Sequence, residues 1–203
     1  VLNTLGKISK GNVLLMQNMN FENNMIQAAF NRGEISKGTI DAIRANMSHV
    51  EIDPISGEKI GFGARPFAVQ KSMREADFIF SAKYLKYRKS QDFNSYVEKL
   101  NEGFDHYRTF IQDLNSSKGT VLVEQMDITK IFLGNLAQHG LIEKELATTG
   151  LNINFFTQAL KGVDEKHTAA SDATDTLEIF QKFSRHIDDL RKNNITAEIA
   201  DLA

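Results

Sequence analysis

The chain has 203 residues, of which 41% are hydrophobic, so it is long enough to bury a full core. Its 24 basic and 26 acidic residues give a formal net charge of -2, which argues against a nucleic-acid-binding surface or a polybasic membrane patch. There is no cysteine, which excludes disulfide bonds and thiol catalysis.

The two prolines, Pro54 and Pro66, lie close together, and the chain after Pro66 contains none. Long uninterrupted helices are therefore permitted over the C-terminal two thirds. Apolar residues recur there at helical spacing, and no fixed-period repeat is visible. We predict an all-α fold over residues 1–203 as a single domain. Its expected architecture is an elongated antiparallel helical bundle of the four-helix-bundle type, with about six or seven helices.

The N-terminal third is predicted to hold two helices and a loop. The first helix covers residues 1–30 and ends at Asn31-Arg32-Gly33, because Gly takes the left-handed cap without strain. The second covers about 35–50, with Ser36 as a possible N-cap. Residues 51–66 are a Gly/Pro-containing loop, which is either a functional crossover or a simple connector.

Two long helices are predicted next, over about 67–88 and 93–114. The second carries an a/d heptad repeat that keeps one apolar face toward partner helices, weakened at Gly103. The members of this repeat are Phe93, Val97, Leu100, Phe104, Tyr107, Ile111 and Leu114.

The C-terminal part repeats the helical pattern. A helix is expected over 122–136, ended by Gln138-His139-Gly140, although Val121 to Val123 has an ambiguous strand character. Further helices are expected over about 141–161 and 173–193, and another weak repeat begins at 195. The predicted buried residues of the 173–193 helix are Leu177, Phe180, Phe183, Ile187 and Leu190.

Motifs for catalysis or metal binding are missing from the sequence. The five histidines are scattered, and His186 with Asp189 is interpreted as an exposed surface pair. There is no Glu-x-x-His pair for a di-metal bundle, no Gly-x-Ser-x-Gly elbow and no phosphate loop. We therefore predict no metal, no cofactor and no enzymatic activity.

The candidate ligand-binding residues are Lys71, Arg74 and Thr129. Lys71 and Arg74 are three positions apart, so both can face one side of a helix and bind a carboxylate or phosphate. The alternative is a solvated helix face, neutralised by Glu75 and Asp77. Thr129 interrupts an apolar face, where its hydroxyl could contact a ligand or bond to a backbone carbonyl one turn earlier.

One stretch carries a resemblance to a known family. Residues 73–80, Met-Arg-Glu-Ala-Asp-Phe-Ile-Phe, are followed by Tyr84-Leu85-Lys86 and by 93–100, Phe-Asn-Ser-Tyr-Val-Glu-Lys-Leu. This succession resembles the extracytoplasmic helical sensor domains of bacterial chemoreceptors and sensor kinases. Ala76 stands where that family usually has Lys, and Phe80 where it usually has Leu.

The resemblance implies a periplasmic ligand-binding domain that signals in chemotaxis or through a histidine kinase. Its ligand would be a small carboxylate held by Lys71 and Arg74, and it would work as a homodimer. Apolar membrane-spanning segments of about twenty residues are expected before Val1 and after Ala203. The alternative is a cytoplasmic or secreted helical protein-protein interaction module, such as an effector, scaffold or secretion accessory, without a small-molecule ligand.

Overall fold

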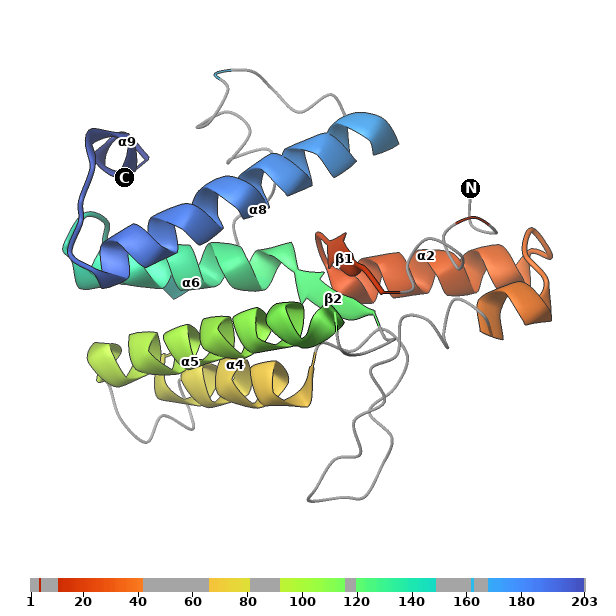
Figure 1. The fold of residues 1–203 in the computed structure, drawn as a ribbon, viewed down its shortest axis with the longest axis horizontal. Helices are drawn as coiled ribbons and strands as arrows, with labels where there is room; N and C mark the ends of the chain where they lie inside the picture. Colours follow the sequence, from red (N-terminus) through yellow and green to blue (C-terminus); the bar gives the residue numbers. More distant parts are fainter. Residues whose placement is uncertain are drawn as a thin grey trace. The chain divides into compact units, whose positions relative to one another are not determined.

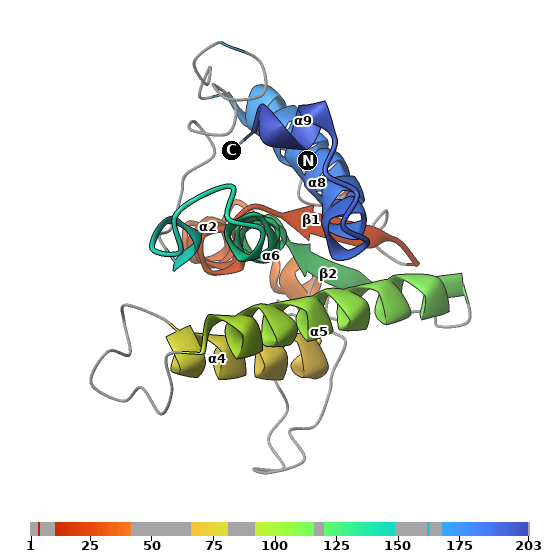
Figure 2. The ribbon, with the colours of Figure 1, turned by 90° about the vertical axis from the view of Figure 1, so that its left-hand side faces the viewer.

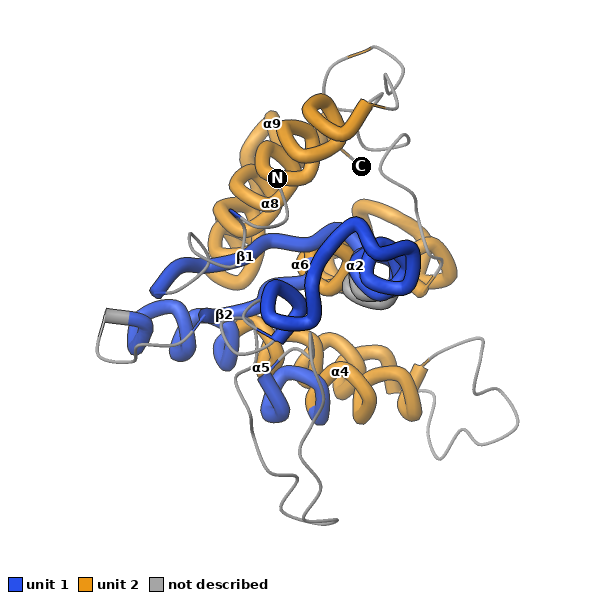
Figure 3. The backbone as a smooth tube through the Cα atoms, turned by 90° about the vertical axis from the view of Figure 1, so that its right-hand side faces the viewer, with its two compact units in different colours: residues 1–71, 105–124 blue, residues 72–104, 125–203 orange. Residues whose placement is uncertain are grey.

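A computed structural model of the chain describes residues 4, 11–41, 66–80, 92–115, 120–148, 162 and 168–202. These residues are mostly helical, as predicted for an all-α bundle (Figure 1). The chain divides into two compact units, coloured separately in Figure 3. Unit 1 comprises Val1–Lys71 and Asp105–Glu124, and unit 2 comprises Ser72–Phe104 and Gln125–Ala203. That residues 1–203 form one domain stays a prediction.

Unit 1 contains a two-stranded parallel sheet, whose strands replace parts of two predicted helices. Strand β1 (Val13–Met16) pairs with β2 (Val121–Glu124), with Val13 opposite Val121. Gly11 precedes β1 at φ +73°, a left-handed turn that separates it from the preceding residues. Both strands are short apolar runs whose pairing partner is remote in sequence. A periodicity read along the chain therefore could not distinguish them from helix.

Helix α2 (Met19–Asn31) ends where the sequence predicts, but it begins at Met19, after β1, so the predicted helix over residues 1–30 is wrong over residues 13–18. Asn18 caps its N-terminus by accepting from the Phe21 amide, and Glu22 accepts from the amides of Gln17 and Asn18. Gly33 follows the helix at φ +75°, as expected of a C-terminal stop. Residues 37–41 are helical, and the Ser36 hydroxyl accepts from the Thr39 amide, which confirms its capping role.

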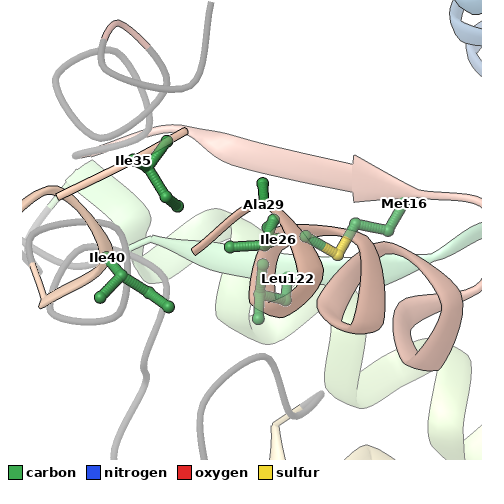
Figure 4. Packing of buried hydrophobic residues seen from close by; sticks show 6 residues of the cluster. All are labelled: Met16, Ile26, Ala29, Ile35, Ile40 and Leu122. Carbon is green, nitrogen blue, oxygen red and sulfur yellow. The ribbon is translucent and has the colours of Figure 1, made fainter. Parts of the chain in front are cut away.

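The core of unit 1 joins its sheet to α2 and to the segment that follows α2. Figure 4 shows these side chains from β1, from β2 and from residues 26–40 meeting in one cluster. Its buried members are Met16, Ile26, Ala29, Ile35, Ile40 and Leu122. The sheet is thus stabilised by packing on one helix, because two strands alone are marginal in water.

Helix α4 (Phe67–Phe80) and helix α5 (Phe93–Gln112) begin at the residues predicted from the sequence. The predicted 81–88 part of the first of these helices and the loop at 51–65 lie outside the described residues. Asp92 caps α5, since its carboxylate accepts from the Asn94 amide and the Ser95 hydroxyl. These hydrogen bonds, chiefly that from Ser95, hold the pKa of the Asp92 carboxyl below its ordinary value.

The predicted heptad face of α5 is buried from Phe93 to Tyr107, which confirms it as a core-forming face. Within unit 2, α4 and α5 lie side by side and antiparallel, because Phe80 contacts Phe93 and Met73 lies next to Gly103 (Figure 2). Helix α5 is followed by the short 3-10 helix η2 (Asp113–Asn115).

Helix α6 (Gln125–Gln138) is buried along most of its length and packs on α5 in unit 2. A Cβ added at Gly134 would lie 2.7 Å from the Leu100 side chain, so the two helices approach closely at this glycine. Gly140, at φ +70°, ends the helical turn as predicted. The predicted helix at 141–161 is wrong over its first part, which forms turns and the 3-10 helix η3 (Leu146–Thr148).

Helix α8 (Ala169–Arg191) confirms the last long helix and is followed by the short α9 (Ala197–Ala200). It packs against α6 with the same direction, since Phe183 stacks on Phe132 at 4.2 Å and His139 contacts the Leu190 carbonyl (Figure 1). The consecutive helices α4 and α5 are thus antiparallel, as predicted, whereas α6 and α8, which are not consecutive, are parallel. Leu177, predicted to be buried, is 47% exposed.

Candidate ligand-binding pocket

The predicted site residues do not form one cluster. Lys71 and Arg74 are both exposed on α4, and Lys71 belongs to unit 1 while Arg74 belongs to unit 2. Thr129 is buried on α6, where its hydroxyl accepts a hydrogen bond from the Gln125 amide one turn earlier. No hydrogen bond or ion pair among the described residues joins Arg74 to Thr129. The three-residue ligand site therefore stays a prediction.

The acidic neighbours of Arg74 pair with other helices. Glu75 pairs with Lys99 of α5 at 3.0 Å, and Asp77 pairs with Lys130 of α6. Arg74 makes no ion pair with another described residue. Glu75 and Asp77 therefore do not pair with Arg74, which is exposed, and the solvated helix face and the anion site both stay predictions.

Lys130 and Asp77 also border the buried ring of Tyr96. The Lys130 ammonium lies 6.0 Å from the ring centroid, and the Tyr96 hydroxyl donates to the Ala147 carbonyl at 3.1 Å. Burial, and then the nearby Asp77 charge, raises the pKa of Tyr96 far above its ordinary value. Tyr96 therefore stays a neutral hydrogen-bond donor, with a structural role.

A polar pocket of about 450 Å³ lies in unit 2 at the C-terminal ends of α6 and α8. This volume is within the range of small-molecule sites. Its lining contains four side-chain amides, an imidazole and a guanidinium, with no carboxylate. The lining residues are Asn101, Asn135, Gln138, His139, Leu190, Arg191 and Asn193.

One wall of the pocket is a reciprocal amide pair. Asn135 donates to the Asn101 side-chain oxygen at 2.8 Å, and Asn101 donates to the Asn135 oxygen at 3.2 Å. Asn135 also donates to the Ile131 carbonyl at 2.8 Å, which uses its second N–H. Asn101 is only half-buried and keeps one N–H for another partner. The pair thus fixes an amide donor at the pocket wall.

His139 presents a defined tautomer there. Its Nε2 lies 2.9 Å from the Leu190 carbonyl oxygen. Because a carbonyl only accepts, Nε2 carries the proton of this contact. This contact also ties the end of α6 to the end of α8.

The pocket's charge comes from the end of α8. Arg191 is exposed in the last turn, where a cation complements the partial negative charge of the helix C-terminus. Asn193 follows at φ 55°, a left-handed conformation that Asn tolerates. The pocket therefore combines a guanidinium, suited to a carboxylate, with carbonyl ends of helices, suited to a hydrogen-bond donor.

His186 corrects another prediction from sequence. It is 1% exposed and faces Phe132 of α6, with ring centroids 6.2 Å apart, so it is not part of a surface pair. Its Nδ1 lies 4.0 Å from Asp189, beyond hydrogen-bond distance. The sequence contained a signal for this burial, since Ile179, Phe183, His186 and Leu190 are spaced 4, 3 and 4.

Comparison with known protein families, curated proteins and solved structures finds no match for this chain. Within the described ranges, no helix is both long and apolar enough to cross a membrane. In the same ranges, no group of three His, Cys, Asp or Glu side chains is placed to hold a metal ion. The pocket and the residues that line it are therefore the features that bear on function.

Proposed function

We propose that this chain is the extracytoplasmic ligand-binding sensor domain of a transmembrane signalling receptor, a chemoreceptor or a histidine kinase. The observation that carries the proposal is the polar pocket of unit 2, formed where α6 and α8 end. A signal would arise if a ligand changed the relative position of these two packed helices, because helices shift as rigid rods. A ligand drives such a shift only through its different affinities for the two arrangements.

The lining indicates the class of ligand. A carboxylate fits Arg191, which can donate two parallel hydrogen bonds to it. A neighbouring hydroxyl or ammonium group on the same molecule fits the amide oxygens and the helix carbonyl ends. We therefore propose a small carboxylate that also carries a hydrogen-bond donor, such as a hydroxy acid or an amino acid. The exposed Lys71 and Arg74 are the competing location for the carboxylate.

Matched arginine variants separate the two locations. Hydroxy acids and amino acids are screened by thermal shift against wild type, Arg191→Gln and Arg74→Gln, and binding is quantified by calorimetry. We expect at least one acid to bind wild type and Arg74→Gln equally, with about tenfold or greater weakening in Arg191→Gln, as for a lost charged hydrogen bond. Asn193→Gly, which keeps the left-handed backbone, serves as a second pocket variant.

The possible outcomes are distinct. Loss of binding in Arg74→Gln alone would place the ligand on α4 and remove the pocket from the proposal. Absence of binding by every acid tested would reject the small carboxylate ligand. Circular dichroism of each variant shows whether a loss reflects unfolding.

The membrane and assembly parts of the proposal have their own tests. A periplasmic sensor domain of this kind is expected to form a homodimer, which sedimentation of the chain with and without ligand measures. The gene is expected to encode an apolar segment of about twenty residues on either side of these 203 residues. Flanking sequence without such segments would contradict the receptor assignment and favour a cytoplasmic or secreted protein.

A protein-protein interaction module is the second candidate, supported by an apolar patch on α2 in unit 1. Phe21 is 63% exposed and Met25 is 52% exposed, and at i, i+4 spacing they share one helix face. Such a face can dock an amphipathic helix. Amphipathic helical peptides should then stabilise wild type but not the Phe21→Ser/Met25→Ser variant, with Leu177→Ser as the control. Binding of peptides without binding of acids would favour this alternative.

A further inference from the structure

The sheet of unit 1 has two strands and therefore two outer edges. The Val121 amide of β2 donates to the carbonyl of Asn12, just before β1, at 3.2 Å. In a parallel ladder, every second residue of a strand turns both of its backbone groups toward the partner strand. Leu14 therefore faces β2, as Asn12 does. The N–H and C=O groups of Val13 and Leu15 point the other way, along the outer edge of β1.

This outer edge of β1 is open over Val13 to Leu15. No group in the described part of the chain bonds to the outward N–H or C=O of either residue. The next outward amide, that of Gln17, donates to the Glu22 carboxylate at 2.9 Å. Val13 and Leu15 are half-buried, so their edge is within reach of another chain.

The outer edge of β2 is protected. There the Glu124 amide donates to the hydroxyl of Tyr107 on α5 at 3.3 Å, and Glu124 places a charged side chain on the strand. Proteins commonly protect sheet edges with charges, prolines or covering elements, because an open edge pairs with other chains. Residues 11–21 contain neither a charged residue nor a proline. The edge of β1 therefore lacks the protection that β2 has.

We propose that β1 is a dimer interface, at which the β1 strands of two copies of this chain pair antiparallel about a twofold axis at Leu14. This register places Val13 opposite Leu15 of the second copy, and the two residues of each such pair exchange both backbone hydrogen bonds. Every outward N–H and C=O group of Val13 and Leu15 is then satisfied. The two sheets join into one continuous sheet.

A second copy fits this edge because the edge is complementary to itself. A twofold axis brings the same surface patch of both copies together, so any charged side chain near the axis would approach its own copy. The absence of charge from residues 11–21 means that no like charges meet when the strands pair. Leu14, which packs partly against the core cluster, meets Leu14 of the second copy across the axis.

The shared edge is short, so the dimer is expected to be weak and dependent on concentration. It supplies an interface for the homodimer of the proposed receptor domain. The pairing itself depends only on the strand and not on the proposed function.

Sedimentation of the full chain from about 10 μM to about 1 mM, a range suited to weak interfaces, tests the pairing. Val13→Pro removes an outward N–H at the first residue of β1, where proline is tolerated, and leaves the β1–β2 ladder intact. Val13→Thr, which keeps the N–H and the branched shape, is the matched control. We expect Val13→Pro to weaken dimerisation by about tenfold or more and Val13→Thr to leave it nearly unchanged.

A single cysteine locates the axis, because the chain has no cysteine of its own. In Leu14→Cys the two Cα atoms would lie about 4.5 Å apart across the axis, within the range of a disulfide. Mild oxidation should therefore link this variant into a covalent dimer. Leu15→Cys, which is offset from its own copy, and Met25→Cys, exposed on α2, are the controls and should stay largely unlinked.

Three results would overturn the proposal. The first is a chain that stays monomeric up to about 1 mM. The second is a dimer that is weakened by Phe21→Ser/Met25→Ser but not by Val13→Pro, which would place the second copy on α2. The third is a monomer that binds an extended apolar peptide through the same edge, with binding lost in Val13→Pro, because the edge would then serve another protein.

Circular dichroism shows whether each variant folds. If Val13→Pro does not fold, the cysteine variants decide the question, and linking of Leu14→Cys no faster than of Met25→Cys would reject the pairing. Dimerisation through β1 without binding of any acid would leave this inference standing and reject the small carboxylate ligand. Binding of an acid by a monomer would do the reverse.

Discussion

The contact between α5 and α6 and the contact between α8 and α9 both bury polar side chains, but they satisfy them differently. Asn101 and Asn135 exchange two hydrogen bonds, and Asn135 adds a third to a backbone carbonyl. His186 and Ser184 have no such partners among the described residues. A satisfied buried pair adds about 1 kcal/mol per hydrogen bond, whereas an unsatisfied donor costs about 1–3 kcal/mol. The first contact is therefore held by paired hydrogen bonds, whereas the second is not.

Helix α8 is held on α6 through buried aromatic rings. Phe183 anchors it by stacking on Phe132, and both rings are fully buried. Phe183→Ala should lower the free energy of unfolding by about 3–5 kcal/mol, because it removes an aromatic ring from the core. Leu177→Ala, on the exposed side of the same helix, should change it by less than about 0.5 kcal/mol. Urea denaturation measures both, and equal effects would show that α8 is not anchored through this face.

Mutation of the amide pair tests whether it holds α5 and α6 together. Asn135→Ala should destabilise the chain by about 1–3 kcal/mol, because Asn101 loses its partner and a buried hydrogen bond disappears. Asn101→Ala should cost less, since Asn101 is half-buried and its loss leaves the Ile131 bond of Asn135 intact. A double-mutant cycle should give a coupling of about 1 kcal/mol. Additive effects would mean that the pair does not hold the two helices.

Two glycines at helix contacts differ in how much space surrounds them. In Gly134→Ala, the new methyl would approach the buried Leu100 side chain at 2.7 Å, while in Gly103→Ala it would meet the Met73 sulfur at 3.2 Å. Overpacking costs about 1–3 kcal/mol, and alanine regains about 1 kcal/mol of helix propensity. We expect Gly134→Ala to destabilise by about 1 kcal/mol and Gly103→Ala to be near neutral, because Met adapts its shape. Thermal denaturation of the two variants side by side measures the difference.

The smallest expected effect concerns the half-exposed cluster between α4 and α5. Lys99 pairs with Glu102 at 2.6 Å and with Glu75 at 3.0 Å, and these hydrogen bonds, in that order, raise the pKa of Lys99 to about 12. Its contribution is present below pH 10.5 and is lost as the pH rises through 12. Lys99→Met should therefore be less stable than wild type at pH 7 by about 0.5 kcal/mol, with the difference shrinking in alkali. Lys192→Met is the control, and a constant difference across pH would exclude this cause.

Sequence alone predicted the helices whose apolar faces repeat locally. Helices α5 and α8 were predicted because each buries a face with spacings of three and four residues. Strand β1 was missed, and β2 was left ambiguous, because the two pair with each other across more than a hundred residues of sequence. In α8, the buried face that contains Phe183 and His186 also contains Thr176. Leu177, the next residue, therefore points outward.

The candidate pocket was missed for a similar reason. Asn101, Asn135 and Arg191 come from three helices, and no local pattern shows that these residues meet. Asn135 was the one available signal, since it stands in the otherwise apolar run from Ile131 to Ala137. The charge cluster at Lys71 and Arg74 was easier to see because its members are close in sequence. Closeness in sequence does not indicate a cavity.

The parallel pairing of Val13 with Val121 has a consequence for synthesis of the chain. Strand β1 leaves the ribosome about a hundred residues before β2, an interval of roughly 5–20 s at typical elongation rates. During that time the apolar Val13–Met16 segment has no native strand partner, and unpaired strands of this kind are prone to aggregate. The N-terminal unit can therefore be completed only after Glu124 has been made, so a nascent chain stalled before that point should be the form most dependent on chaperones.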